Sequence, residues 1–279
     1  MRASKLPLVL LLAICCLPFT ASAEDDFRQR LYQNSDDSFS QEDDVKAEIV
    51  FGRVLAARIL GRYSFYENDK LNEYVNMVGK GLAQFSGRPE IEFRFAVIDS
   101  DIVNAFAAPG GYIFVTKGAL KNMDDEAELA AVLSHEIAHI TEKHIVKELN
   151  IKGTDNSPTS GFAQVLGGGT GAVKAVFSQM VDQAAEILFE KGLKKQDEFD
   201  ADRVSTILIS NAGYDPSALE RYLKKVSGDE KDTKELVGTH PSFVDRIKNV
   251  DSVLADNQLT GKKQAIAKER FKANVKINL

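Results

Sequence analysis

Apolar residues recur at helical spacing along most of the chain. Between residues 41 and 62 they return every three or four positions, which would give a helix one apolar face. Ser40 followed by Asp43 is typical of a helix start. The same spacing predicts further helices over residues 68–85, 124–149, 173–189, 196–211, 216–226 and 241–255. We therefore expect a mostly helical protein.

A shorter region alternates between apolar and polar positions. Residues 91–98 place an apolar side chain at every second position, which predicts a β-strand. Residues 104–107 and 112–116 predict two more short strands, separated by the turn-forming Pro109-Gly110-Gly111. The charged segment 227–236 is expected to be a surface loop. One small sheet among many helices corresponds to the α+β fold class.

The N-terminal residues have the pattern of a cleaved signal peptide over 1–23. A basic start, a short apolar stretch and the small residues 21–23 follow one another in that order. We expect a polar, flexible leader over 24–40, one domain over 41–256 and a C-terminal tail over 257–279. Elsewhere no apolar run approaches the length of a membrane span, so no transmembrane segment is expected in the mature chain.

The composition and charge of the chain exclude some partners and some catalytic groups. The 279 residues are 44% hydrophobic and 27% charged, as in ordinary globular proteins. Without the basic residues of the signal peptide, 33 basic residues face 41 acidic ones, and this acidic balance argues against a nucleic-acid partner. Both cysteines, Cys15 and Cys16, lie in the signal peptide. The mature chain therefore offers no thiolate as a metal ligand or nucleophile.

A metal-binding motif lies inside the predicted helix 124–149. His135 and His139 are four residues apart, so both imidazoles lie on one helix face and can reach the same ion. Glu136 stands beside them, where it can hold and deprotonate a water molecule. Spacing and residue types together predict a zinc site with a general base.

A catalytic zinc usually needs a third protein ligand. On a continuous helix His144 would point to the opposite face from His135, and Glu142 would lie too far along the axis. Glu198 is the best candidate for the third ligand. Asp202 lies on the same helix face, where it could accept a hydrogen bond from a ligand histidine. The alternative interpretation of these two acidic residues is a solvated helix start.

Together these motifs resemble those of the zinc metallopeptidases that include the CAAX prenyl protease and the heat-shock membrane protease. Three further stretches are similar to that family: residues 104–115, residues 213–216, and His240-Pro241 with Arg246. The signal peptide and the lack of predicted membrane spans favour the family's soluble periplasmic branch, which includes a protease that works at the outer membrane. Because the chain ends soon after residues 241–255, the tetratricopeptide repeats of that protease are not expected here.

The resemblance implies a zincin-like domain with one zinc ion per chain and hydrolysis of polypeptide substrates. It also implies that an edge strand of the sheet faces the active-site cleft and pairs with extended substrate. The residues concerned are Asn104, Ala105, Phe106 and Ala107, with Gly110 and Gly111 ending the edge. His240 could stabilise the oxyanion or occupy the fourth zinc position, and Arg246 would anchor its loop through an acidic partner.

Two functions remain open at this stage. The first is an active periplasmic endopeptidase that removes extended or misfolded envelope proteins. The second is a chaperone-like outer-membrane assembly factor whose zinc site is latched or mainly structural, with the assembly machinery as its partner. Glu136 favours the first, because a structural zinc site needs no general base. The glycine-rich residues 167–171 could form a lid over the cleft or a plain loop.

Overall fold

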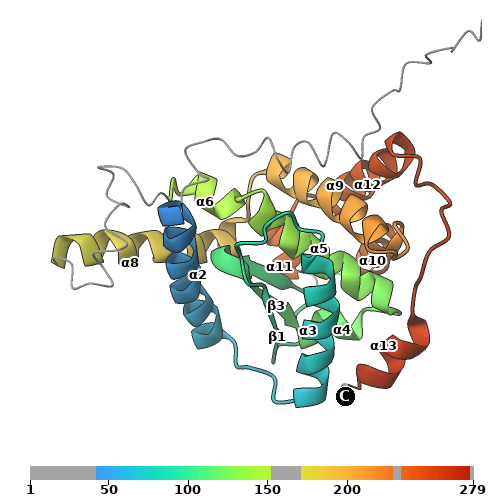
Figure 1. The fold of residues 1–279 in the computed structure, drawn as a ribbon, viewed down its shortest axis with the longest axis horizontal. Helices are drawn as coiled ribbons and strands as arrows, with labels where there is room; N and C mark the ends of the chain where they lie inside the picture. The colour runs from blue at the N-terminus through green and yellow to red at the C-terminus, as the bar shows by residue number, and fades with distance from the viewer. Residues whose placement is uncertain (1–41, 152–170, 229–233, 277–279) are drawn as a thin grey trace, which may run out of the picture.

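The computed structural model describes residues 42–151, 171–228 and 234–276 (Figure 1). The expected signal peptide, the leader and residues 167–170 of the glycine-rich segment lie outside the described residues. None of the described helices combines the length and the apolar character needed to cross a membrane.

Helices form most of the described chain. In chain order they are α2 (Glu42–Arg62), α3 (Asp69–Ala83), α4 (Lys117–Lys121), α5 (Glu126–Thr141), α6 (His144–Glu148), α8 (Gly171–Glu186), the π-helical turn η2 (Ile187–Lys191), α9 (Lys195–Asn211), α10 (Ala218–Val226), α11 (Lys234–Thr239), α12 (Phe243–Asp256) and α13 (Lys268–Asn274). Side-chain caps begin several of them: Asn68 accepts a hydrogen bond from the Leu71 amide in α3, and Asp125 accepts one from the Glu128 amide in α5.

The described strands form a single three-stranded sheet. Its members are β1 (Arg94–Ile98), β2 (Ala105–Ala108) and β3 (Tyr112–Thr116), in the order β1-β3-β2. β1 runs parallel to β3, whereas β2 is antiparallel to it, with Phe106 opposite Phe114. The α+β fold class is thereby confirmed, and β2 lies at the edge of the sheet.

The two faces of the sheet bury their side chains in different clusters, because neighbouring residues of a strand point to opposite faces. The cluster against α3 and α5 includes Val97, Ala107, Ile113, Val115, Leu129 and Leu133. The cluster against α2 and α8 includes Phe51, Leu55, Phe106, Phe114, Met180 and Val181. In Figure 1, α2 and α8 lie on one side of the sheet and α9, α10 and α12 gather at the opposite end. α5 runs between these layers and is buried on all sides.

A short 3₁₀ turn, η1 (Pro109–Gly111), joins β2 to β3. Gly110 has a φ of +72°, a conformation that only glycine adopts without strain. A Cβ built there would also lie 2.6 Å from the Ile49 Cα, so the absence of a side chain lets α2 approach the turn. The amide of Gly110 donates a hydrogen bond to Glu48 Oε1 of α2, which fixes the end of the edge strand.

The single helix predicted over 124–149 is wrong. α5 ends at Thr141, Lys143 has a left-handed φ of +57°, and the chain restarts as α6 at His144. The break turns Ile145 and Val146 into the cluster beneath α2 and α8, where both are buried. Tertiary packing therefore outweighs the local helical preference.

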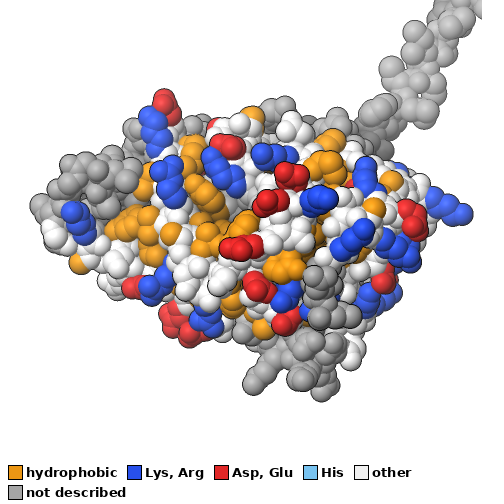
Figure 2. Space-filling model, turned by 90° about the horizontal axis from the view of Figure 1, so that it is seen from below, with side chains coloured by type: hydrophobic (Ala, Val, Ile, Leu, Met, Phe, Trp, Pro, Cys, Tyr) orange, Lys and Arg blue, Asp and Glu red, His pale blue; other side chains and the backbone are white. Residues whose placement is uncertain are grey.

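The described chain also departs from prediction near its C-terminal end. Helix α11 (Lys234–Thr239) begins inside the region 227–236 that was expected as a loop. After residue 256, where a tail was expected, α13 packs on the domain with Phe271 buried, and Arg270 pairs with the buried Glu126 of α5. Over the face in Figure 2, lysine and arginine side chains are interspersed with aspartate and glutamate.

Candidate active site

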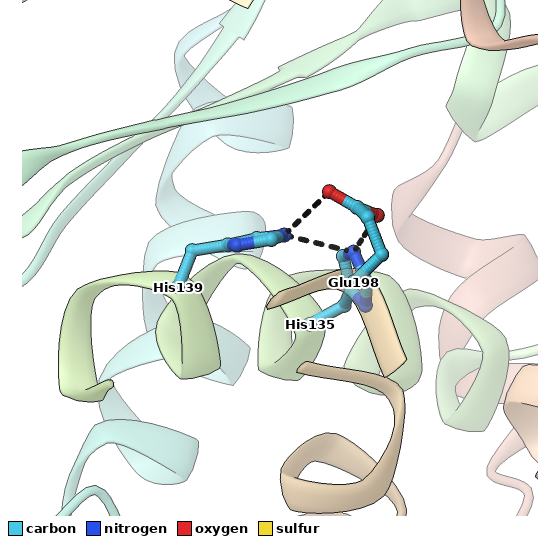
Figure 3. Close-up of side chains that lie close together, drawn as sticks. All are labelled: His135, His139 and Glu198. Carbon is cyan, nitrogen blue, oxygen red and sulfur yellow. Dashed lines mark hydrogen bonds and ion pairs between the residues drawn. The ribbon is translucent and has the colours of Figure 1, made fainter. Parts of the chain in front are cut away.

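The two histidines of the motif and a glutamate from a distant helix meet at one point. His135 and His139 extend from α5, and Glu198 reaches them from α9 (Figure 3). The two Nε2 atoms are 3.0 Å apart, and the Glu198 oxygens lie 3.5 Å from His135 Nε2 and 3.6 Å from His139 Nε2. One donor atom from each residue lies within 4.8 Å of the others, which would allow one ion to contact all three.

The chemistry of these donors fits a metal ion. All three side chains are buried, and Glu198 Oε2 makes no hydrogen bond with any described residue. Burial lowers the pKa of His139 well below its usual value and keeps it neutral, as a ligand must be. Burial favours protonation of Glu198, but the three histidines around it outweigh this and hold its pKa well below its usual value. A neutral imidazole and an ionised carboxylate are therefore ready to bind a cation.

Asp202 and Arg246 orient the first histidine. Asp202 Oδ1 is 3.0 Å from His135 Nδ1, so it can accept a hydrogen bond from the nitrogen that faces away from the donor cluster. Arg246, from α12, donates from Nη2 to Asp202 Oδ1 at 2.6 Å and from Nε to Oδ2 at 3.0 Å. Burial and the positive charge of Arg246 oppose protonation of His135, but its hydrogen bond with Asp202 and the nearby carboxylate of Glu198 prevail and raise its pKa to about 9. A cation binding here would therefore displace a proton from His135.

Glu136 lies beside the cluster but outside the donor set. Its side chain is buried. Burial raises its pKa to about 7, in the range that suits a general base near neutral pH. It lines both of the small cavities that adjoin the cluster.

These cavities lie along the edge strand β2. Both are lined by Ala105, Glu136 and His240. The cavity toward α10 is otherwise mostly apolar, with Val132, Leu219, Tyr222, Leu223 and Leu236. The cavity toward η2 is lined by Phe106, Ala107, Ile145, Ile187, Leu188 and Leu193. An extended chain beside β2 could thus place apolar side chains on either side of Glu136.

The other residues expected at the strand are also near the cluster or at the end of the edge. Asn104 is buried beside the first cavity, and its Oδ1 accepts a hydrogen bond from the Ala105 amide at 2.9 Å. Gly110 and Gly111 lie in η1, at the far end of β2 from Asn104. The free edge of β2 pairs with no strand in the described part of the chain.

His240 follows α11 and lies close to the third donor. Its Nε2 is 3.4 Å from Glu198 Oε2, and its Nδ1 is 3.0 Å from Thr239 Oγ1. Burial lowers the pKa of His240 to about 4, so the ring is neutral near pH 7. This placement suits a group that contacts either the metal or a developing oxyanion.

The residue that sequence reasoning missed is His144. It was expected on the opposite helix face, yet its Nδ1 lies 2.8 Å from the Nδ1 of His139. The contact depends on the left-handed Lys143, and neither Glu142 nor Lys143 is a residue type that signals such a break.

Comparisons with known proteins agree with this geometry. The family "Peptidase family M48" matches residues 69–254. Beta-barrel assembly-enhancing protease from Yersinia pestis is 28% identical over 190 residues, covering 61% of this chain and 36% of that protein. The Escherichia coli K12 protein of the same name is 24% identical over 216 residues, or 71% of this chain and 42% of that protein.

A mitochondrial relative is similar as well. Mitochondrial metalloendopeptidase OMA1 from Schizosaccharomyces pombe is 28% identical over 193 residues, covering 67% of this chain and 54% of that protein. The chain spans about two fifths of the length of the bacterial relatives. Since the family match extends over most of the chain and includes all three residues of the donor cluster, the chain belongs to peptidase family M48.

Proposed function

We propose that this protein is a zinc-dependent endopeptidase that cleaves extended or misfolded polypeptides in the periplasm. The observation that carries the proposal is the convergence of two imidazoles and a carboxylate beside the separate buried carboxylate of Glu136. Two histidines and a glutamate are a known ligand set of catalytic zinc, which leaves a fourth position for water or substrate. A structural zinc site has four protein ligands and no use for a base.

His135, His139 and Glu198 would hold the zinc ion, one per chain. When bound, zinc supplies Lewis-acid polarisation of the scissile carbonyl and makes water easier to deprotonate. Glu136 takes a proton from the attacking water and returns it to the leaving amine. Asp202 accepts a hydrogen bond from His135 Nδ1 and, together with Arg246, keeps that ring in place.

The substrate would bind as an added strand along β2. An unpaired strand edge can form main-chain hydrogen bonds with any extended peptide, so recognition depends little on sequence and suits unfolded chains. Asn104, Ala105, Phe106 and Ala107 would form this platform, and Gly110 and Gly111 its end. The apolar lining of the two neighbouring cavities supports a preference for peptides with apolar side chains near the scissile bond.

Location and partners belong to the same proposal. The N-terminal pattern of residues 1–23 supports export, and two relatives carry the name beta-barrel assembly-enhancing protease. Polypeptides of the cell envelope are therefore the proposed substrates, and outer-membrane assembly machinery is the proposed partner.

A second candidate is supported by His240. Its Nε2 lies 3.4 Å from Glu198 Oε2, near enough to the donor cluster to block the fourth metal position. In that case the protein would be a chaperone-like assembly factor with a latched zinc site.

The test uses the purified mature chain. We expect one zinc ion per chain by metal analysis, together with casein cleavage that a chelator abolishes and added zinc restores. Bound zinc with no cleavage by wild type, but with cleavage by His240→Ala, would favour the latched site. A chain that binds no zinc and cleaves in the presence of chelator would refute the proposal.

A further inference from the structure

His135 and His139 each have a hydrogen-bond partner at the ring nitrogen that faces away from the donor cluster, here called the outer partner. The outer partner of His135 is the carboxylate of Asp202, whereas that of His139 is another imidazole. Nδ1 of His139 and Nδ1 of His144 are 2.8 Å apart, and the two rings are inclined at 72°. Both side chains are buried. At this distance one ring nitrogen must carry a proton and the other must offer a lone pair.

The donor cluster decides which ring donates. His139 Nε2 faces the other donors, at 3.0 Å from His135 Nε2, so Nε2 is the nitrogen that must be unprotonated for ligation. The proton of neutral His139 therefore lies on Nδ1, which donates a hydrogen bond to His144 Nδ1. His144 must then be neutral, with its own proton on Nε2.

We infer that His144 is a positioning residue, which fixes the tautomer and the ring orientation of His139 for metal binding. The inference rests on the proposed zinc site and adds to it a residue that touches neither metal nor substrate.

The backbone conformation before His144 supports this assignment. On a continuous helix a residue five positions after His139 would point roughly 140° away from it. Lys143 adopts a φ of +57° instead, at a cost of about 1 kcal/mol for a residue with a side chain. This turn brings His144 back over His139, while the following Ile145 and Val146 pack in the core.

The two outer partners also share an electrostatic property. Asp202 carries a negative charge, but Arg246 offsets it through two hydrogen bonds. A neutral His144 contributes no charge. Neither partner therefore adds net charge to the pocket, and the buried carboxylates of Glu198 and Glu136 are left to balance a divalent ion.

Three substitutions of His144 separate the effects of its hydrogen-bond acceptor, its bulk and its lack of charge. Oδ1 of asparagine and Nδ1 of histidine are both bonded to Cγ, so His144→Asn keeps a neutral acceptor near the same position. His144→Leu keeps much of the bulk without an acceptor, and His144→Asp keeps the acceptor but adds a charge. Lys147→Leu, on the exposed side of α6, is the matched control.

Zinc affinity, measured by competition with a chelator, is the first readout. We expect His144→Leu to weaken zinc binding about 10- to 100-fold, as for other partners of ligand histidines, and His144→Asn to restore most of the loss. His144→Asp should keep the affinity but lower the cleavage rate, because added negative charge reduces the polarising power of the ion. The unfolding midpoint of each metal-free variant checks that the fold is intact.

The tautomer is the second readout. A long-range ¹H–¹⁵N spectrum of zinc-loaded wild type should show His139 protonated at Nδ1 and His144 at Nε2. Wild-type affinity in folded His144→Leu, an Asn variant as weak as Leu, or the opposite tautomers would each overturn the role of His144. Failure of wild type to bind zinc would instead overturn the proposed zinc site and this inference together.

Discussion

The substitution Glu136→Gln tests the proposed chemistry most directly. Glutamine has nearly the same size as glutamate, but its amide cannot accept a proton from water. Glu136 is 5% exposed and lines both cavities beside the metal donors. The change therefore removes the base while leaving the shape of the site intact.

The size of the effect follows from the position of Glu136. A positioned general base contributes about 10²- to 10⁴-fold in rate, or roughly 2.7–5.4 kcal/mol of activation free energy. Because Glu136 is not one of the three metal donors, zinc content should stay at one ion per chain. Burial raises its pKa from 4.5 to about 7, so the folded protein holds this proton more tightly than the unfolded chain, and stability falls as the pH rises from about 4.5 to about 7. Metal-free Glu136→Gln should therefore be at least as stable as wild type at pH 8.

The assay compares cleavage of a quenched fluorescent peptide with zinc content and thermal unfolding. Glu142→Gln, the same substitution at the C-terminal end of α5, serves as the control and should cleave at the wild-type rate. Undiminished cleavage by zinc-loaded Glu136→Gln would refute the mechanism. Loss of zinc from that variant would place Glu136 among the ligands.

Three other predictions test the metal ligands and the fold. Glu198→Ala should weaken zinc binding at least tenfold, whereas Glu142→Ala should not, as judged by chelator titration; equal affinities of Glu198→Ala and wild type would remove Glu198 from the ligand set. His240→Ala should raise basal cleavage or weaken zinc binding if His240 blocks the fourth position, whereas lost cleavage at unchanged affinity would assign it to the oxyanion. Although burial opposes its charge, hydrogen bonds from Arg270, Tyr214 and Tyr74 hold the pKa of Glu126 below its usual 4.5. Its stabilising effect should therefore be present above about pH 4.5 and lost at lower pH, and Glu126→Gln should be about 1.5–3 kcal/mol less stable at pH 7 with a weaker dependence on acid. Urea unfolding at both pH values measures this, and identical acid profiles would contradict it.

Local sequence determined most of the secondary structure and two of the three residues of the donor cluster. The spacing of four between His135 and His139 places two imidazoles on one helix face whatever the rest of the fold does. The alternation over residues 91–98 and the turn at Pro109-Gly110-Gly111 likewise depend on neighbouring residues, and strands formed on both sides of that turn. Short-range periodicity carries such information because backbone geometry fixes it.

Glu198 and Asp202 were found by a different route. A cluster of acidic residues at a helix start is usually solvated, so only the need for a third ligand and the family resemblance singled it out. Glu198 and Asp202 are buried because α9 packs against α5, which brings them to histidines about 60 residues earlier in the chain.

Only the tertiary structure decided the surroundings of the second histidine. The continuous helix predicted through Leu149 would have separated His144 from His139, but α5 ends at Thr141. Burial of Ile145 and Val146 beneath α2 and α8 accompanies the left-handed turn at Lys143, a conformation that no property of lysine favours. Likewise, Arg246 reaches Asp202 only because α12 folds back onto α9. Such contacts depend on long-range packing energies, which local propensities do not contain. This is why the contact of His144 with His139 and that of Arg246 with Asp202 could not be derived from residue spacing alone.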